Sequence, residues 1–205
     1  MARISRTLAL GTAVALGAAW VGWGAYIRRK TDQVPYTTAL HVDGVEIRRY
    51  PDTVVARTTA DTQNEAFQRL FRYIQGDNRL GKEIEMTAPV STDSETIEMT
   101  APVASERSEA GMEMSFFLPG EYTAEGAPKP TDEDVSVEAV GARTLAVRPF
   151  SWYATADRVE ENRRRLFDTL SAHDLTPNGE PFLLRYDDPW TPPFMRRNEI
   201  AVELE

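Results

Sequence analysis

One octapeptide occurs twice in the chain, and its alternating pattern strongly restricts the local structure. Residues 83–90 read E-I-E-M-T-A-P-V, and residues 96–103 read T-I-E-M-T-A-P-V. In each copy, apolar and polar residues alternate, which is the period of a strand that buries one face. The short polar stretch between the copies can turn the chain. We therefore predict a β-hairpin formed by tandem duplication, in which the proline of each strand lies at an edge or a strand end.

The first thirty residues differ in composition from the rest. Residues 7–27 contain no charged side chain, and a helix of this length, rising about 1.5 Å per residue, extends about 30 Å, enough to cross a bilayer. Trp20 and Trp23 suit the headgroup region near its end, and three cations follow. We expect residues 1–30 to form a single-pass N-terminal membrane anchor. A cleaved signal segment is the alternative, and the side of the membrane stays open because cations flank both ends.

The chain as a whole is acidic and has no cysteine. It contains 32 Asp and Glu against 23 Lys and Arg, with a formal net charge of −9. This acidity argues against a nucleic-acid partner. The absence of Cys excludes disulfides, thiolate nucleophiles and thiolate metal ligands. The chain also lacks the G-x-S-x-G, H-E-x-x-H and Walker A motifs and has only two histidines, so we expect a protein that is not an enzyme.

A regular series of strands and helices follows the N-terminal segment. Residues 31–44 show little periodicity and are expected to be a tether, and residues 45–205 are expected to be one domain. The first predicted helix follows a cap at Asp61 or Thr62 and repeats apolar residues at helical spacing. The predicted strands are residues 45–50, 53–60, 112–118, 135–139, 144–150, 182–186 and 199–204, and the second predicted helix is residues 156–173.

The order strand-strand-helix-strand-strand occurs twice in this series. Such an order suggests two similar halves that join in a single domain of the α+β class. We expect the strands of the two halves to form a distorted antiparallel β-barrel or paired sheets. In either arrangement, the two helices flank the strands.

Three further segments accompany the repeated M-T-A-P-V sequence. They are E-I-R-R-Y at residues 46–50, Y-I-Q-G-D-N at residues 73–78 and W-T-P-P-F-M-R-R-N-E-I at residues 190–200. Together, these segments resemble the SOUL haem-binding protein family over about residues 45–204, and the doubled motif looks like its bacterial and archaeal branch. The resemblance implies the same α+β architecture. It also implies that a membrane-tethered domain binds haem or a related porphyrin, as a ligand rather than a catalytic cofactor, for transport, buffering or delivery.

The same resemblance implies a ligand cleft along the first helix. In it, Phe67, Leu70 and Phe71 form an apolar slot for the macrocycle, and Arg69 and Arg72 are the partners of the propionates. The residues alone also allow another interpretation, because apolar residues at helical spacing usually form the core, and arginines beside them usually form a solvated flank. Both interpretations stay open at this point.

No residue is marked as an axial iron ligand, and the metal ligand stays unknown. SOUL-type animal members have a histidine just before the tyrosine of the E-I-R-x-Y segment, where this chain has Arg49, which stays protonated and cannot bind iron. His41 lies in the expected tether. His173 ends the second helix, where a cation interacts favourably with the helix dipole. Further conceivable ligands are Met86, Met99 and Tyr50. We therefore predict haem that is held by packing.

A function of a different class fits the same sequence. A non-haem receptor for small amphipathic molecules, or a protein-interaction module, could use this fold, because a fold does not determine function. The oligomeric state and the partner proteins stay open. The segment at residues 190–200 has two interpretations as well: it lines the mouth of a ligand site, or it covers an open end of the sheet.

Overall fold

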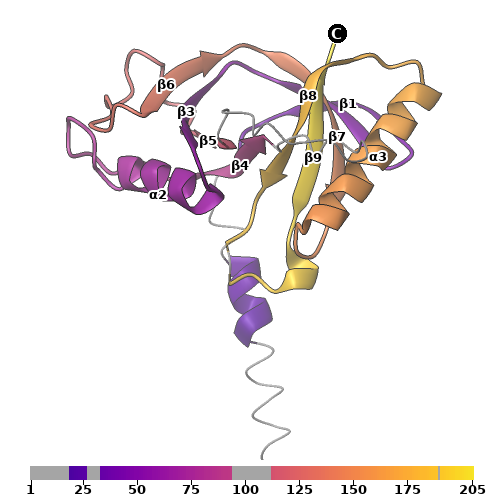
Figure 1. The fold of residues 1–205 in the computed structure, drawn as a ribbon, viewed down its shortest axis with the longest axis horizontal. Coiled ribbons are helices and arrows are strands. Elements are labelled where there is room, and N and C mark those ends of the chain that lie inside the picture. Colours follow the sequence, from indigo (N-terminus) through magenta and orange to yellow (C-terminus); the bar gives the residue numbers. More distant parts are fainter. Residues whose placement is uncertain (1–18, 27–32, 94–111, 189) are drawn as a thin grey trace, which may run out of the picture.

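The computed structural model describes residues 19–26, 33–93, 112–188 and 190–205, and their main feature is one antiparallel sheet (Figure 1). The elements follow one another as β1 (Thr37–Val42), β2 (Val45–Tyr50), β3 (Thr53–Ala60), α2 (Gln63–Ile74), β4 (Thr87–Asp93), β5 (Met112–Phe117), β6 (Val135–Val140), β7 (Arg143–Phe150), α3 (Ala156–Ala172), β8 (Pro177–Arg185), the 3-10 helix η1 (Pro193–Met195) and β9 (Asn198–Leu204). The nine described strands are ordered β1-β2-β7-β9-β8-β4-β5-β3-β6 across the sheet.

The order of the strands contains an internal correspondence. The series β2-β3-α2-β4-β5 is followed by β6-β7-α3-β8-β9. β2 pairs with β7 and β6 pairs with β3, while β4 pairs with β8 in the middle. The α+β class is therefore confirmed. β1 and β6 end the sheet, so the described strands form an open sheet and not a closed barrel. The duplication of the halves stays a prediction.

The two helices cover the same face of the sheet, one on each half (Figure 1). α2 packs against β3 and β5, and α3 packs against β7, β8 and β9. Val90 and Thr92, two residues apart in β4, share a face. Val90 packs with the α2 core, and Thr92 lies opposite Leu183, which packs with α3. We call this side the helix face. The opposite face has its own buried apolar cluster: Val34, Tyr50, Val55, Phe117, Leu145, Val147, Phe182, Leu184 and Ala201.

Local sequence signals explain where the helices begin and end. The Thr62 side chain caps α2, because its hydroxyl accepts a hydrogen bond of 3.2 Å from the Glu65 amide. Gly76, just after α2, has φ +104°, a left-handed conformation that favours glycine. α3 ends at Ala172, and His173 is its C-cap. Both helix predictions are therefore confirmed to within a few residues.

The expected tether contains a strand. Thr37–Val42 forms β1, which pairs with β2 through a turn at Asp43 and Gly44. Both turn residues have positive φ, 47° and 77°, the pattern of a type I′ hairpin turn. An Asp-Gly pair between two extended segments is a strong hairpin signal, and it predicts β1 where periodicity alone does not.

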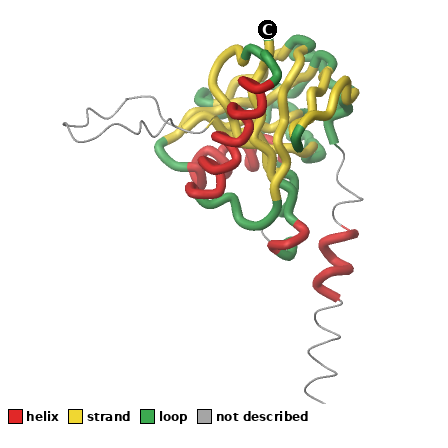
Figure 2. The backbone as a smooth tube through the Cα atoms, turned by 90° about the vertical axis from the view of Figure 1, so that its right-hand side faces the viewer, coloured by secondary structure: helices red, strands yellow, loops and turns green. Residues whose placement is uncertain are grey.

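The N-terminal segment corrects one prediction. Residues 19–26 form a short helix that stands apart from α2 and α3 (Figure 2), and no helix in the described part of the chain is both long and apolar enough to cross a membrane. The prediction of a single-pass N-terminal membrane anchor is therefore wrong. Instead, the short helix contacts the domain. The Trp20 indole Nε1 donates a hydrogen bond of 2.7 Å to the Trp190 carbonyl, and a Cβ at Gly24 would lie 2.9 Å from Cδ of Pro192.

The repeated octapeptide is described only in its first copy. Residues 96–103 lie outside the described residues, so the hairpin of the two copies stays a prediction. In the first copy, the strand begins at Thr87 rather than at residue 83. β4 is an inner strand between β5 and β8, and Pro89 falls at the register shift between Thr87 and Val90. A bulge is another place where a strand tolerates proline, which explains why an inner strand contains one.

Candidate functional site

The predicted apolar residues of α2 form a core residue and a half-buried aromatic pair. Leu70 is fully buried in the core beneath α2. Phe67 and Phe71 are half-buried and stack on each other, with their ring centroids 5.6 Å apart. Phe67 also meets the ring of Phe116 edge-on at 5.4 Å. The aromatic pair is therefore anchored in the core and keeps part of its surface exposed.

The two predicted arginines lie on the other flank of α2. Because a helix turns about 100° per residue, Arg69, two positions from both Phe67 and Phe71, points away from the aromatic pair. Arg69 and Arg72 both form ion pairs with nearby acids. The partners are Glu65 and Asp134 for Arg69, both at 2.9 Å, and Asp132 for Arg72, at 3.5 Å. To bind a ligand carboxylate, these arginines must first break the ion pairs that they form with these acids.

The Y-I-Q-G-D-N segment closes α2 through buried polar contacts. The Tyr73 hydroxyl donates a hydrogen bond of 2.8 Å to the Pro128 carbonyl, and burial raises the pKa of Tyr73 to about 12. The Asn78 amide nitrogen donates to the carbonyls of Tyr73 and Lys82, and its oxygen accepts from the amides of Leu80 and Lys82. This part of the family signature holds the loop after α2 and therefore has a structural role.

A row of paired residues crosses the helix face between α2 and α3. Val90 lies opposite Arg185 of β8, which in turn lies opposite Asn198 of β9. The row continues to Phe116 on the α2 side and to Phe150 on the α3 side. Because cross-strand partners share a face, Arg185 stands on the helix face where the two halves of the sheet meet. We call these five residues the midline row.

Arg185 is a half-buried cation that no described residue of the protein neutralises. Its neighbours in β8 fix its direction, because Leu183 packs with α3 and Leu184 packs on the opposite face. Its side chain makes no hydrogen bond, ion pair or ring contact with any residue that the structure describes, and burial lowers its pKa. The Thr92 hydroxyl, diagonal to Arg185 on the same face, is buried without a hydrogen-bond partner. Two polar groups without partners thus lie near each other.

The opposite face carries a buried charged cluster around Glu199. This carboxylate accepts hydrogen bonds from Arg48 at 2.8 and 3.0 Å, from Arg197 at 2.8 Å and from the Tyr186 hydroxyl at 2.6 Å. Burial alone would raise the pKa of Glu199, but the hydrogen bonds and charges of the two arginines outweigh burial and lower it. Burial and the neighbouring carboxylate raise the pKa of Tyr186. Arg48 also lies over the Tyr36 ring, 4.3 Å from its centroid. Every charge at the centre of the cluster is therefore paired.

A small cleft opens on this opposite face. It measures about 260 Å³ with open solvent included, and it is lined by Tyr50, Thr53, Pro89, Phe117, Arg143, Leu145, Phe182 and Leu184. Pockets that bury small ligands usually measure about 300–1,000 Å³. The cleft is thus too small for a tetrapyrrole macrocycle.

The two histidines and Arg49 all lie on the half of the sheet that α3 covers. His41 is exposed on β1, and His173 Nε2 lies 2.9 Å from Oδ2 of Asp43. Arg49 is exposed on β2, and β7, β9, β8 and β4 separate β2 from β5 beneath α2. At about 4.8 Å per strand, five steps correspond to about 24 Å along the sheet. None of these residues adjoins the aromatic pair of α2.

The remaining ligand candidates have separate environments. Tyr50 is buried on the opposite face, where Arg48 Nη1 lies 3.3 Å from its hydroxyl. Met86 is half-buried against the α2 core, and Met99 lies outside the described residues. Within the described ranges, no group of three or more His, Cys, Asp and Glu side chains is placed to hold a metal ion.

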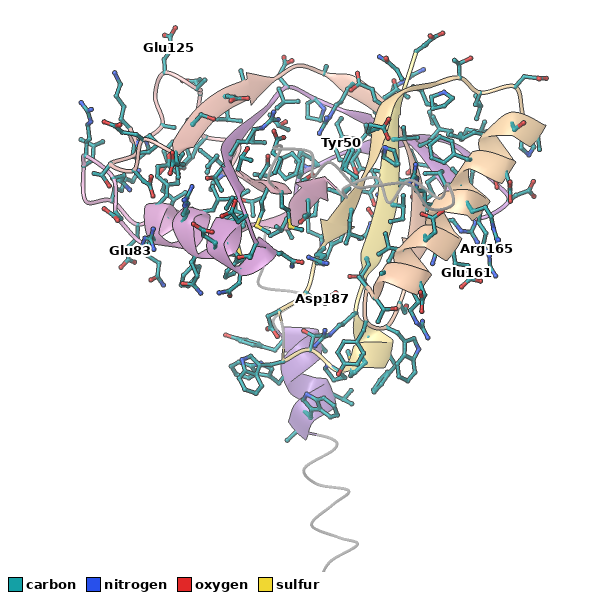
Figure 3. The ribbon with its side chains drawn as sticks, viewed as in Figure 1. Tyr50, Glu83, Glu125, Glu161, Arg165 and Asp187 are labelled. Atoms are coloured by element: carbon teal, nitrogen blue, oxygen red, sulfur yellow. The ribbon has the colours of Figure 1, made fainter. Side chains whose placement is uncertain are left out.

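The segment at residues 190–200 combines structural contacts with exposed aromatic surface. The Asn198 amide donates a hydrogen bond of 2.8 Å to the Trp152 carbonyl, and Glu199 is the centre of the charged cluster. Trp190 and Phe194 are exposed, and the Trp190 carbonyl accepts the hydrogen bond from Trp20 of the short N-terminal helix, which Figure 3 shows below Asp187. The end of the segment therefore ties β9 to its neighbours, whereas its beginning forms surface.

The comparisons with known proteins find a family match over most of the chain. Residues 31–203 match the family described as SOUL heme-binding protein. The chain is similar to heme-binding protein 2 of Mus musculus, with 29% identity over 65% of this chain and 62% of the mouse protein. It is 30% identical to heme-binding protein 2 of Homo sapiens over 61% of this chain and 60% of the human protein. The matched region thus spans less than two thirds of either relative.

Solved structures share the fold at low sequence identity. The EcmrR C-terminal domain aligns with a TM-score of 0.52 and 11% identity, over 83% of this chain and 98% of that domain. A hydrolase from Listeria innocua aligns with a TM-score of 0.56 and 10% identity, over 82% of this chain and 94% of that protein. At such identities, the likeness concerns the fold alone.

Proposed function

The chain belongs to the SOUL haem-binding protein family, and on this premise we propose that it binds haem or a related tetrapyrrole reversibly. The observation that carries the proposal is the family match, which extends from before β1 into β9. The relatives named heme-binding protein 1 and heme-binding protein 2 support the same class of ligand. In this proposal, haem is a bound ligand for transport, buffering or delivery, and the chain supplies no catalytic group.

The aromatic flank of α2 is the proposed contact surface for the macrocycle. Phe67 and Phe71 offer two stacked rings that are partly exposed, and Leu70 supports them from the core. A flat conjugated ligand stacks favourably on such rings. This half-buried aromatic surface on α2 supports the proposed placement of the macrocycle.

The propionates require cations near this surface. Arg69 and Arg72 are the candidates on α2 itself, and both would have to leave Asp134 and Asp132. Arginine forms bidentate hydrogen bonds with carboxylates, so such an exchange is chemically sound. Their position on the flank away from the aromatic pair makes them the weaker part of the proposed site.

Titration of the full chain with haemin, followed by the Soret band, tests the proposal. We expect saturable binding, and we expect Phe67→Ala together with Phe71→Ala to weaken it by about tenfold or more, which is about 1.4 kcal/mol. Phe194→Ala is the matched control, because this exposed aromatic lies on η1, away from α2. A folded wild-type protein that does not shift the Soret band contradicts the proposal.

A non-haem small-molecule receptor is the second candidate, and the cleft on the opposite face favours it. Its lining joins aromatic rings with one cation, Arg143, and the cleft would have to widen to admit a small aromatic molecule. Widening the cleft by Phe182→Ala should strengthen the binding of a small aromatic probe such as benzoate if this face is a receptor. The same substitution should leave haemin binding unchanged if haem binds beside α2.

A further inference from the structure

We propose that Arg185 receives a carboxylate of the bound ligand on the helix face, at the midline of the sheet between α2 and α3. The inference rests on the proposed function and adds a specific partner for the anionic edge of the ligand. It also moves the cationic part of the site from the outer flank of α2 to the centre of the molecule.

The position of Arg185 follows from the strand pairing. It lies directly opposite Val90, which packs with the α2 core, and opposite Asn198 on the α3 side. Phe67 and Phe71 pack against that same α2 core. An arginine extends several ångströms from its Cα, so a guanidinium at this point lies on the side of α2 that faces α3. A ligand that stacks on the aromatic pair and extends toward the midline meets this cation first.

The environment of Arg185 is unfavourable for a cation without a partner. A buried charge is normally paired and hydrogen-bonded, because transfer out of water destabilises it strongly. Arg48, the fully buried arginine of β2, follows this rule and binds both oxygens of Glu199. Among the described residues, Arg185 has no such acid. A ligand carboxylate would supply the missing negative charge.

Thr92 is a second, independent sign of a ligand at the same place. Its hydroxyl is buried and has no hydrogen-bond partner, although buried hydroxyls normally have one. Thr92 lies opposite Leu183 and is therefore diagonal to Arg185, at about 7–8 Å between backbone positions. Because the hydroxyl itself is buried, it can donate to one oxygen of a carboxylate only after neighbouring side chains move, while the guanidinium binds the other oxygen. The two groups together recognise a carboxylate better than an uncharged polar group.

Haemin and its dimethyl ester distinguish this inference from the proposed function. The two ligands share the macrocycle and the iron, but the ester has no carboxylate. We expect the wild-type chain to bind haemin about tenfold more tightly than the ester. Arg185→Met should weaken haemin binding about tenfold and leave the affinity for the ester unchanged. Arg49→Met is the matched control, because Arg49 is an exposed arginine on a strand of the α3 half.

Each outcome has one meaning. If the wild type binds neither ligand, the proposed function fails. If it binds both equally, or if Arg185→Met lowers the two affinities alike, haem binding stands and the role of Arg185 is overturned. The thermal unfolding midpoint of Arg185→Met should equal or exceed that of the wild type, because the variant removes a cation without a partner. Should that variant not fold, Thr92→Val supplies the test, and an unchanged preference for haemin over its ester in this variant overturns the inference.

Discussion

Two arginines on inner strands of the sheet, one on each face, have opposite environments for a charge removed from solvent. Arg48, on the opposite face, binds both oxygens of Glu199 and lies over the ring of Tyr36. Arg185, on the helix face, has no partner among the described residues. Both side chains stand on inner strands of one sheet, β2 and β8. The environment, and not the residue type, therefore separates a structural cation from one that is free to bind a ligand.

The comparison also separates the roles of the two faces. On the opposite face, the polar side chains that surround Glu199 bind one another, and the adjacent cleft is small. On the helix face, half-buried rings lie on α2, and the Thr92 hydroxyl and the Arg185 guanidinium, which have no partner in the described part of the chain, lie between α2 and α3. The polar groups around Glu199 are satisfied and gain little from a ligand, although the same face also contains Arg57, whose buried Nε has no hydrogen-bond partner. A face with unsatisfied groups gains a hydrogen bond for each one.

The largest effect on stability should come from disrupting the ion pairs around Glu199 on the opposite face. Glu199→Gln removes the carboxylate that Arg48 and Arg197 share and leaves Arg48 with Glu46 alone, and loss of one partner from a buried ion pair typically costs about 3–5 kcal/mol. We expect a decrease of this size in the free energy of unfolding near pH 7, measured by urea denaturation. Glu203→Gln, a less buried acid of the same strand, is the control and should change stability by less than about 0.5 kcal/mol.

The same substitution has a defined pH dependence. The pKa of Glu199 is lowered in the folded protein, so its stabilising effect is complete above the pKa of an unfolded glutamate, about 4.3. The effect is lost as the pH falls through the lower folded value. The stability difference between the wild type and Glu199→Gln should therefore be constant from pH 7 to about 5 and shrink below about 4. A difference that grows on acidification would show that Glu199 is not ionised in the fold.

The second largest effect should distinguish Leu70, which supports α2 from the core, from Phe71, which is proposed to contact the ligand. Leu70→Ala removes a fully buried side chain and should cost about 2–5 kcal/mol of unfolding free energy. Phe71→Ala should cost less, because Phe71 is only half-buried, but it should weaken haemin binding more. Leu80→Ala is the control, because this leucine is mostly exposed. If Leu70→Ala and Phe71→Ala alter stability and affinity in the same ratio, the aromatic pair has no separate contact role.

Much of the fold could be predicted from the sequence because its signals are local. Alternation located the strands, and the hydroxyl of Thr62 followed by helical periodicity located α2. The strand β1 was missed although the Asp43-Gly44 pair predicts its turn. The single-pass anchor was wrong because the absence of charge in a segment shows only that it is apolar. It does not show that the segment is a continuous spanning helix, and Trp20 instead contacts Trp190.

The site could be predicted only in part, because it depends on contacts between distant strands. Helical spacing identified Phe67, Leu70 and Phe71, and the structure divides them into half-buried rings and a core residue. The sequence already indicates that Arg69 lies on the flank of α2 away from both rings, because it is two positions from each and positions two apart on a helix do not face each other. Arg185 is a single cation at the end of the apolar run in β8, but only the pairing with Val90 shows which face it occupies.

A smaller effect should come from the paired arginines of α2. Asp132→Asn together with Asp134→Asn removes the acid that holds Arg72 and one of the two acids that hold Arg69, whose pair with Glu65 remains. If these arginines bind propionates, the double variant should bind haemin more tightly than the wild type. Exposed ion pairs contribute only about 0–1 kcal/mol each, so stability should change little. Glu160→Gln together with Glu161→Gln on α3 is the control for net charge. An equal gain in both variants would mean that only the overall charge matters, which leaves Arg185 as the specific cation.

The smallest effect should come from the candidate iron ligands on the α3 half. His41→Ala together with His173→Ala should change haemin affinity by well under tenfold, which is about 1.4 kcal/mol, because neither histidine adjoins the aromatic pair of α2. Arg49→His restores the residue of the animal SOUL-type members, yet β2 lies about 24 Å along the sheet from β5 beneath α2. This variant should therefore leave the Soret maximum of the complex unchanged. A shift of the maximum toward that of a histidine-ligated haem would place the iron beside β2. That result would contradict both a haem site on α2 and a role for Arg185 in binding haem. The lack of a partner for Arg185 would then need an explanation that does not involve haem.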